Sequence, residues 1–380
     1  MKKTLAFALL LLSLATLQAQ DTTYARRIIR ELSSHRMYGR GASYHGDSIA
    51  AHFLASEMQR LGVLPLQTNY LQHYTYNCYS LEGLLDLEIN GEELTPYTQY
   101  RVASTFRKGF SQQLADAKFK KQLKDGTWIV GVDKLDTYSP IVGDQQPNPA
   151  YIQVLNSALP AKVRKIHASL PVQFRWLYRS QNVVGYIPGV IDSMVVFTAH
   201  YDHCGIMGDA VVFPGAHDNA SGTAAVLDLA RIVSQSKPYY TYVFMLFSGE
   251  ESGLKGSQYA AQHPLIDYAK VKLLCNIDMF CGGDEGLMCF NAKANNTKPY
   301  FDRLCQLNAE SRVAPEIRPR DNSANSDHYW FSSLCPSIFL LTMGQPYGGY
   351  HDPADRCESC GLNHYADYLT LIRRMAGIGE

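Results

Sequence analysis

From about residue 182 onward, the chain alternates short apolar runs with an amphipathic segment. The segment "ASGTAAVLDLARIVSQ" is rich in alanine and has apolar residues at helical spacing. It lies among apolar runs that are typical of strands buried on both faces of a sheet, namely "NVVGYIPG", "SMVVFTAHYD", "YTYVFMLFSG" and "VKLLCNIDM". Strands that alternate with helices predict an α/β fold with a mostly parallel sheet covered on both sides.

The region before this sheet is expected to begin with two helices. Apolar residues recur at helical spacing in "YARRIIRELSS" and in "GDSIAAHFLASEMQRLG", and a glycine-rich loop separates the two segments. The second helix is expected to end at Gly62. The following segment, "YLQHYTYNCYSLEGLLDLEING", predicts strands with a hairpin turn at Asn90-Gly91.

Residues 83–179 show the least regular pattern. They mix a charged stretch of helical character, "FSQQLADAKFKKQLKDG", with short strand signals and proline-rich turns. We interpret 83–179 as an insertion or lid-like subdomain and see no chemical motif in it. Residues 20–82 and 180–380 are then the two parts of the main domain.

The first 19 residues have the pattern of a secretory signal. Lys2 and Lys3 precede an apolar run that is too short to predict a membrane span, and small residues end the segment at Ala19. We expect a bacterial signal peptide that is cut after Ala19. The mature protein is therefore expected in the periplasm or outside the cell.

Composition indicates a folded protein without a polyanionic partner. Hydrophobic residues make up 46% of the chain and charged residues 18%, which is sufficient for a core and gives no sign of disorder. Lys and Arg number 35, as do Asp and Glu, so no basic excess supports binding to nucleic acid or to an anionic membrane.

The nine cysteines do not form a disulfide-dense pattern, and their odd number leaves at least one unpaired. Cys357 and Cys360 form a C-x-x-C pair, which alone is weak evidence for zinc or redox chemistry because a zinc site needs further ligands. Two interpretations remain open for this pair, a local disulfide and two buried thiols.

Side chains able to bind a metal follow several of the predicted strands. Each alone has an ordinary structural explanation; for example, "DNASG" resembles a helix cap. In parallel sheets of this kind, bound molecules lie at the carboxyl ends of the strands. The candidate side chains follow these ends, so we expect them to meet in one cleft. They are His200, Asp202, Asp218, Glu250, Glu251 and Asp278, with His351 as a further candidate in "YGGYHDPAD".

So many carboxylates in one cleft would repel one another and raise their pKa values. A pair of divalent cations removes this conflict, and histidine together with carboxylate suits zinc. Two zinc ions roughly 3.5–4 Å apart would share a bridging carboxylate and a bridging water. The sequence therefore predicts a centre for two Zn²⁺ ions.

The order of the motifs resembles a known family. The chain is similar to the dinuclear zinc exopeptidases related to aminopeptidase Y and aminopeptidase S, a group that also includes the glutamate carboxypeptidases. The resemblance implies a three-layer α/β/α sandwich with a mostly parallel, mixed central sheet of the phosphorylase/hydrolase-like type. The motifs that carry it, in order, are "MYGRGA", "AHYDHCG", "GAHDNASGTAAVLDLAR", "FSGEESGLKGS", "NIDM", "NSDHYWF" and "YHDPAD".

The resemblance implies a role for each candidate ligand. His200 would bind one zinc ion and His351 the other, with Asp218 bridging the two. Glu251 would be a terminal ligand of one ion and Asp278 a terminal ligand of the other. The expected function is an exported aminopeptidase that acts on peptides.

The same resemblance implies two catalytic residues that do not bind metal directly. Glu250 would be the general base, which takes a proton from the bridging water and passes it to the leaving amine. Asp202 would hold the ring of His200, because metal-bound histidines commonly donate their other N–H to a carboxylate.

Four further residues near these motifs are not among the ligands that the resemblance implies. His217 stands where the family commonly has an acid, and two roles remain open for it, contact with the metal site and tuning of substrate entry. We interpret His203 as structural or as part of a pocket wall. Asp327 and His328, in "SDHYW", match a motif that supports the site or lines the substrate pocket.

Several alternatives remain open at this point. A glutaminyl cyclase on the same scaffold would use a single zinc ion, and a carboxypeptidase would use the same metals with a different substrate pocket. A receptor-like relative would have lost its ligands, whereas this chain retains all five and the base. A peptide substrate is the expected partner, without nucleic acid or membrane, and the oligomeric state is not predicted.

Overall fold

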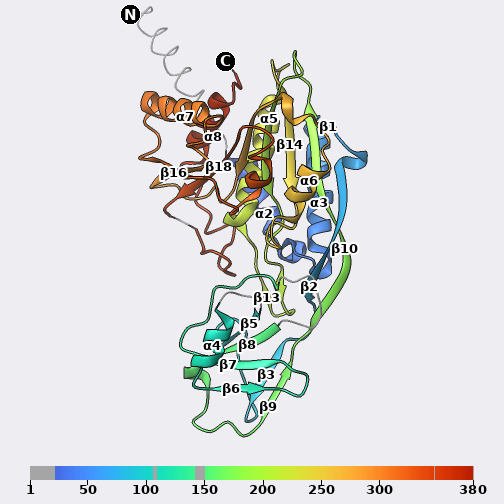
Figure 1. The fold of residues 1–380 in the computed structure, drawn as a ribbon, viewed down its shortest axis with the longest axis vertical. Coiled ribbons are helices and arrows are strands. Elements are labelled where there is room, and N and C mark those ends of the chain that lie inside the picture. The colour runs from blue at the N-terminus through green and yellow to red at the C-terminus, as the bar shows by residue number, and fades with distance from the viewer. Residues whose placement is uncertain (1–21, 106–108, 142–149, 346, 380) are drawn as a thin grey trace, which may run out of the picture.

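The computed structural model describes residues 22–105, 109–141, 150–345 and 347–379. The expected signal peptide lies outside the described residues. A large mixed sheet dominates the upper part of the molecule (Figure 1). Across the sheet its strands are β1 (Leu64–Pro65), β10 (Val172–Ile187), β14 (Thr241–Phe247), β11 (Met194–His200), β15 (Val271–Ile277), β18 (Ser337–Met343), β16 (Gly286–Phe290) and β17 (Ile317–Pro319), and β2 (Leu71–Leu81) also pairs with β10.

The centre of this sheet is parallel. The neighbouring strands β14, β11, β15 and β18 all run in the same direction, whereas β10 and β16 flank them in antiparallel orientation. The apolar runs of the sequence are therefore strands, as predicted, and their carboxyl ends lie at one edge.

Each central strand is buried on both faces. In β11, Phe197 packs into the core on one side of the sheet and Val196 into the core on the other, because successive side chains of a strand point in opposite directions. In β14, Phe244 and Val243 divide in the same way. This explains why these runs are apolar throughout instead of alternating.

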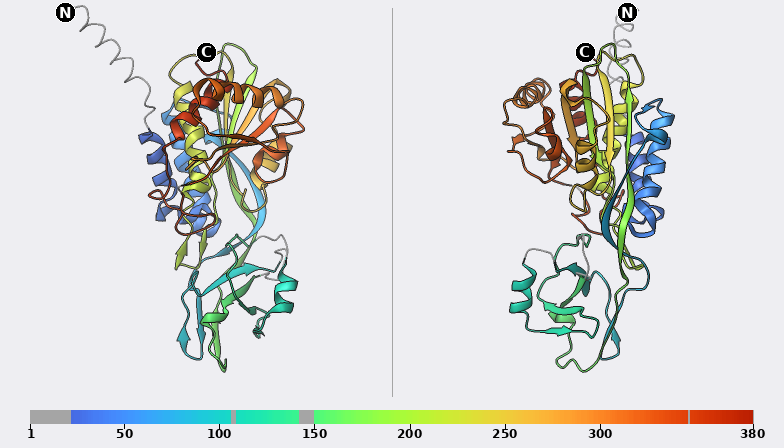
Figure 2. Two further views of the ribbon diagram at one scale, coloured as in Figure 1. Left: turned by 90° about the vertical axis from the view of Figure 1, so that its left-hand side faces the viewer. Right: turned by 45° about the vertical axis from the view of Figure 1, so that its right-hand side comes forward.

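Helices cover both faces of the sheet (Figure 2). One core contains residues of α2 (Thr23–Leu32), α3 (Gly46–Arg60), α5 (Gly222–Val233), α7 (Lys298–Ser311) and α8 (Tyr365–Met375), and the opposite core contains residues of α6 (Lys255–Gln262) and η7 (Asp327–Phe331). The predicted three-layer α/β fold with a mixed sheet is confirmed. Within the described residues, no helix is both long enough and apolar enough to span a membrane.

The strands β2 and β10 continue as an antiparallel pair to a second, smaller unit at the bottom of Figure 1. The boundary expected at residue 179 falls inside β10. We call residues 82–171 the insertion. It contains β3 (Asp86–Ile89), β4 (Glu92–Glu93), β5 (Tyr100–Ser104), α4 (Phe110–Asp116), β6 (Lys120–Gln122), β7 (Trp128–Val132), β8 (Ala150–Leu155) and β9 (Ile166–Ser169).

Part of the insertion differs from the sequence expectation. The stretch from Phe110 to Gly126 carries a helical pattern, but α4 ends at Asp116 and Lys120–Gln122 forms β6. Pairing with β7 satisfies the backbone of β6 and outweighs its helical propensity. The hairpin turn at Asn90-Gly91 is confirmed, with φ of 58° and 91° at the two positions.

The insertion shares its core with the loop that follows β11. Met207, Val211 and Phe213 of that loop pack into the same hydrophobic cluster as the strands of the insertion. The insertion is therefore anchored directly beside the carboxyl end of β11.

A disulfide corrects the expectation for the C-x-x-C pair. Cys360 is bonded to Cys281, whose Cα lies 5.4 Å from its own, and Cys357 is a buried free thiol. Neither of the two interpretations is right for the pair as a whole, because the fold brings a distant third cysteine next to Cys360.

The helices α2 and α3 are joined by one carboxylate. Glu57 accepts hydrogen bonds from Arg27 (2.7 Å) and Arg60 (2.7 Å) and from the Tyr24 hydroxyl (3.3 Å). Burial alone would raise the pKa of Glu57, but the two guanidinium groups outweigh it and lower the pKa below its ordinary value.

We expect Glu57→Gln to reduce the free energy of unfolding by about 1 kcal/mol at pH 7, a modest value because both arginines are about half exposed. The lowered pKa means that this stabilisation is present above the unfolded-state pKa and is lost as the pH falls through the folded-state pKa. Urea unfolding should show a smaller difference between the variant and wild type at pH 3 than at pH 7. Glu310→Gln, at an exposed pair with Arg374, is the control and should differ from wild type by less than about 0.5 kcal/mol.

Candidate metal centre

The parallel strands deliver the candidate ligands to one edge of the sheet. His200 is the last residue of β11, Asp278 follows β15, and Glu251 lies four residues after β14. Asp218 lies in the short turn η5 (Ala216–Ser221), where the backbone angles of Asp218 and Asn219 are not helical, and this turn leads into α5. His351 comes from the loop between β18 and α8, so five separate segments meet here.

Four of these side chains form two histidine–acid pairs, and the fifth, Asp218, lies between the pairs. Nε2 of His200 lies 3.2 Å from Oδ1 of Asp278, and Nε2 of His351 lies 3.1 Å from Oε1 of Glu251. Asp218 directs Oδ1 toward His200 (3.4 Å) and Oδ2 toward His351 (3.2 Å). One carboxylate oxygen thus faces each histidine–acid pair.

The donor set fits two divalent ions. Each half offers one imidazole nitrogen, one terminal carboxylate and one oxygen of Asp218, which are ligands that zinc accepts. Nε2 of His351 is buried and, within the described residues, makes no hydrogen bond of acceptable geometry, although two carboxylate oxygens lie within 3.2 Å. This arrangement suits a cation bound between Nε2 of His351 and the two carboxylate oxygens better than it suits a hydrogen bond.

The two adjacent glutamates have opposite electrostatic environments. Burial, together with the negative charges of Glu251 and Asp327, raises the pKa of Glu250 well above its ordinary value. Burial also acts on Glu251, but the nearby His351 outweighs it and lowers the pKa of Glu251 to about 2. Glu250 is thus the carboxylate of the pair that more readily holds a proton.

Asp202 supports the site through several contacts. Its carboxylate accepts hydrogen bonds from the backbone N–H of Glu250 (3.1 Å) and of Glu251 (3.2 Å). Nδ1 of His200 lies 3.2 Å from the main-chain carbonyl of Asp202 and 3.7 Å from its carboxylate. Asp202 therefore links the end of β11 to the loop after β14, beyond the contact with His200 that the resemblance implies.

Asp355, in the motif "YHDPAD", fixes the turn that carries Asp218. Its carboxylate accepts hydrogen bonds from the backbone N–H of His217 (2.9 Å) and of Asp218 (3.1 Å). The ring of His217 stacks on Tyr347 with centroids 4.4 Å apart. Among the described residues, the two groups with metal-ligand spacing contain neither His217 nor the buried pair Asp327 and His328, and Asp218 lies between the groups without belonging to either.

His203 lies closer to the centre than expected. The sequence indicates a structural or pocket-wall residue, but Nδ1 of His203 is 3.0 Å from Oε1 of Glu251. The donor atoms of His203, Cys204, Glu251 and His351 all lie within 4.8 Å of one another, and so do those of His200, Glu250 and Asp278. The sequence signal was the adjacency "HYDHC", in which His203 and Cys204 directly follow Asp202.

The insertion reaches the centre through Tyr138. Nδ1 of His351 lies 2.8 Å from the main-chain carbonyl of Tyr138, which accepts its N–H and leaves Nε2 to face Asp218 and Glu251. The Tyr138 ring stacks on Phe213, with ring centroids 4.2 Å apart. A second residue of the insertion, Tyr97, donates a hydrogen bond from its hydroxyl to Asp352. No sequence motif marks Tyr138, because it acts through its backbone.

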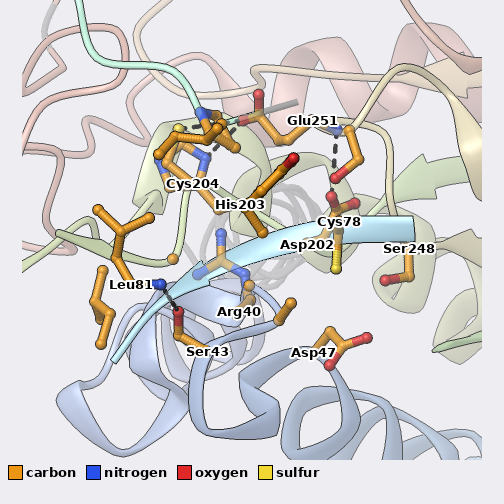
Figure 3. A pocket seen from close by; sticks show the side chains of 18 of the residues that line it. Arg40, Ser43, Asp47, Cys78, Leu81, Asp202, His203, Cys204, Ser248 and Glu251 are labelled. Atoms are coloured by element: carbon orange, nitrogen blue, oxygen red, sulfur yellow. Dashed lines mark hydrogen bonds and ion pairs between the residues drawn. The ribbon is translucent and has the colours of Figure 1, made fainter. Parts of the chain in front are cut away.

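A small cavity of about 30 Å³ lies beside the centre (Figure 3). His203, Cys204 and Glu251 border it, and the opposite part of its wall includes Asp47 and Arg40.

Arg40 ties the site-bearing loops together. Its guanidinium is completely buried, and the hydrogen bonds that it donates within the described residues go to main-chain carbonyls. The acceptors are Leu32 (2.8 Å), Tyr201 (2.6 Å), Pro214 (2.5 Å), Gly215 (2.8 Å) and Asp218 (3.4 Å). The neighbouring Gly39 has φ of 62°, and a Cβ there would lie 2.1 Å from the carbonyl oxygen of Gly205. The "MYGRGA" segment is therefore packed backbone against backbone on the loop that follows β11.

We expect Arg40→Lys to destabilise the fold by roughly 2–4 kcal/mol, because an ammonium cannot reach all five carbonyls and buried acceptors lose their donors. The melting temperature and the bound zinc per chain should both fall. Arg36→Lys is the matched control, since Arg36 is exposed and pairs with Glu31 in the same segment. A melting temperature of Arg40→Lys equal to that of the control would contradict this role.

Comparisons with known proteins agree with the predicted resemblance. A model of peptidase family M28 matches residues 182–375, more than half of the chain. A probable leucine aminopeptidase of Trichophyton verrucosum is 32% identical over 157 residues, which are 39% of this chain and 42% of that protein. The chain spans only about half the length, or less, of the curated relatives it matches.

Solved structures show the same fold over nearly the whole chain. BSAP, a zinc aminopeptidase from Bacillus subtilis, has a TM-score of 0.66 at 18% identity, with 94% of each chain covered. A Bacteroides thetaiotaomicron glutaminyl cyclase has a TM-score of 0.53 at 14% identity, with 95% of this chain and 98% of that chain covered. The family match, the strand-end motifs and this fold agree, and the chain belongs to peptidase family M28.

Proposed function

We propose that this protein is an exported zinc aminopeptidase that removes N-terminal residues from peptides. The observation that carries the proposal is the position of Asp218 between two histidine–acid pairs, which gives a place for two metal ions. The names of similar proteins, a probable leucine aminopeptidase and a zinc aminopeptidase, support the choice of reaction. The signal-like pattern before Ala19 supports export.

In the proposed mechanism, His200 and Asp278 would hold one zinc ion and His351 and Glu251 would hold the second. Asp218, which lies between the two pairs, would be a ligand of both. When bound, two zinc ions supply an acidified water and polarise the peptide carbonyl. Asp202 and Asp355 hold the backbone of the loops that present these ligands.

Glu250 is the proposed general base. It lies with His200 and Asp278 in one group of donor atoms, beside the proposed place of the attacking water. The same carboxyl group takes a proton from this water and delivers it to the nitrogen of the leaving amine. Glu251, with its pKa lowered to about 2, is suited to remain ionised as a metal ligand.

The proposal is tested by counting zinc per chain and assaying three substrates in parallel. We expect about two zinc ions, release of nitroaniline from an aminoacyl-nitroanilide, and no cleavage of a peptide with a blocked N-terminus. Cyclisation of an N-terminal glutamine peptide with one zinc ion would instead identify a glutaminyl cyclase. Cleavage of the blocked peptide from its C-terminus would identify a carboxypeptidase.

Glu250→Gln should retain both zinc ions and lower kcat by about 10²–10⁴-fold, the usual contribution of a general base. Zinc content by elemental analysis and initial rates on the nitroanilide measure the two effects. Asp218→Ala is the contrasting variant, which should lose zinc together with activity. Near-normal turnover of Glu250→Gln would rule out Glu250 as the base.

A further inference from the structure

A buried carboxylate that the proposed mechanism does not use lies across the small cavity from Glu251. Asp47 is 2% exposed and belongs to the first turn of α3. It lines the cavity from the part of the wall opposite Glu251 (Figure 3). The N-cap position of α3 is held by His45, so Asp47 does not have the place of a helix-capping residue.

Both carboxylate oxygens of Asp47 accept hydrogen bonds from β10. The Tyr178 hydroxyl donates to Oδ1 (2.5 Å) and the Ser180 hydroxyl to Oδ2 (2.8 Å), and the backbone N–H of Ser48 also donates to Oδ1 (2.8 Å). Burial outweighs these bonds and raises the pKa of Asp47 to about 6.

The raised pKa of Asp47 shows that its charge does not serve the stability of the fold. Because the folded-state pKa lies above the unfolded-state pKa, the stabilisation linked to the protonated carboxyl is lost as the pH rises through about 6. At neutral pH the group is mostly ionised, and burying that charge opposes folding. A different reason is therefore needed for a carboxylate at this position.

Ser180 connects Asp47 to the segment that carries the two glutamates. Its Oγ lies 3.0 Å from Oγ of Ser248, the residue that follows β14. A serine hydroxyl has one proton and an ionised carboxylate only accepts, so at neutral pH Ser180 donates to Asp47 and accepts from Ser248. We call these three residues the Asp47–Ser180–Ser248 link, and each of them is at most 2% exposed.

Ser248 fixes the start of the segment after β14. Its carbonyl accepts hydrogen bonds from the Tyr74 hydroxyl (2.7 Å) and from the backbone N–H of Gly256 (3.0 Å). Between Ser248 and Glu250 stands Gly249, whose φ of 69° lies in the left-handed region that favours glycine. A flexible residue directly before Glu250 makes the position of this glutamate sensitive to how firmly Ser248 is held.

We propose that Asp47 is a positioning residue for the general base Glu250. Its negative charge orders Ser180 and Ser248, and thereby the start of the segment that presents Glu250. Asp202 holds the same segment further along, through the backbone N–H of Glu250. Tyr178 binds the other oxygen of Asp47 and lies outside the link. The inference rests on the proposed role of Glu250.

Two variants interrupt the link at different points. Asp47→Asn removes the charge at nearly constant size, and Ser180→Ala removes the middle hydroxyl. Each should lower kcat on an aminoacyl-nitroanilide by about 10- to 100-fold, because a small misplacement of a catalytic group is sufficient for such a loss. KM and the zinc content should stay close to wild type. The double variant should be no slower than the slower single variant, since both changes break one link.

Two controls separate this role from burial and from general packing. Asp228 is a fully buried carboxylate in the second half of α5 that pairs with Arg231. Asp228→Asn should lower the melting temperature and keep kcat. Tyr178→Phe removes a donor to Asp47 but leaves the link intact, so it should keep most of kcat.

Backbone hydrogen exchange reports on the segment without relying on activity. In zinc-loaded protein, the N–H groups of residues 248–254 should exchange faster in Asp47→Asn and Ser180→Ala than in wild type, because local opening becomes easier. The melting temperature of Asp47→Asn at pH 8 should not fall below that of wild type, since the variant no longer buries a charge.

Each result decides for or against the inference. Wild-type kcat and wild-type exchange in both variants would overturn it and leave the aminopeptidase proposal standing. A loss of kcat that comes with lost zinc in both variants would also overturn it, because the defect would then lie in the metal ligands. If Asp47→Asn does not fold, Ser180→Ala decides alone. A wild-type protein without aminopeptidase activity would overturn the proposed function and this inference together.

Discussion

The buried guanidinium of Arg40 is the contact on which the arrangement of the site depends. It donates to five main-chain carbonyls from segments that are distant in sequence, including those of Tyr201 and Asp218. Burial lowers the pKa of Arg40 to about 10, so the group remains charged at neutral pH. A permanent positive charge therefore lies among loops that also carry buried carboxylates, where it offsets part of their mutual repulsion.

The insertion contributes directly to the site, because one of its backbone carbonyls contacts a candidate metal ligand. The main-chain carbonyl of Tyr138 orients His351, and Phe213 from the loop after β11 packs against the Tyr138 ring. The loop that packs against Tyr138 is thus the same loop that contains His203 and Cys204. The insertion therefore contacts the His351 half of the centre directly, through this backbone carbonyl.

The sequence predicted the parts of this structure that depend on pattern. Buried parallel strands place their carboxyl ends at one edge, so the meeting of His200, Asp218 and Asp278 followed from the apolar runs and the order of the motifs. The contact of Tyr138 with His351 could not be predicted, because a carbonyl leaves no mark in the sequence. The bond between Cys281 and Cys360 was missed for a related reason, since pairing is a matter of distance in space.

His203 shows a different limit. Its neighbours His200 and Asp202 already accounted for the motif, so a third polar residue in the same loop had an ordinary explanation as a pocket wall. Only the loop conformation after β11 turns its ring toward Glu251.

The Cys281–Cys360 disulfide changes the covalent distance between the two halves of the centre. Along the chain, Asp278 and His351 are separated by 73 positions, but Cys281 follows Asp278 by three positions and Cys360 follows His351 by nine. The shortest covalent route between these residues therefore runs through the disulfide and is about one sixth as long. Because the entropy of closing a loop grows with the logarithm of its length, this shortcut lowers the entropic cost of bringing the two side chains together by about 1.5 kcal/mol. An oxidising compartment would thus help to assemble the centre itself as well as to stabilise the fold around it.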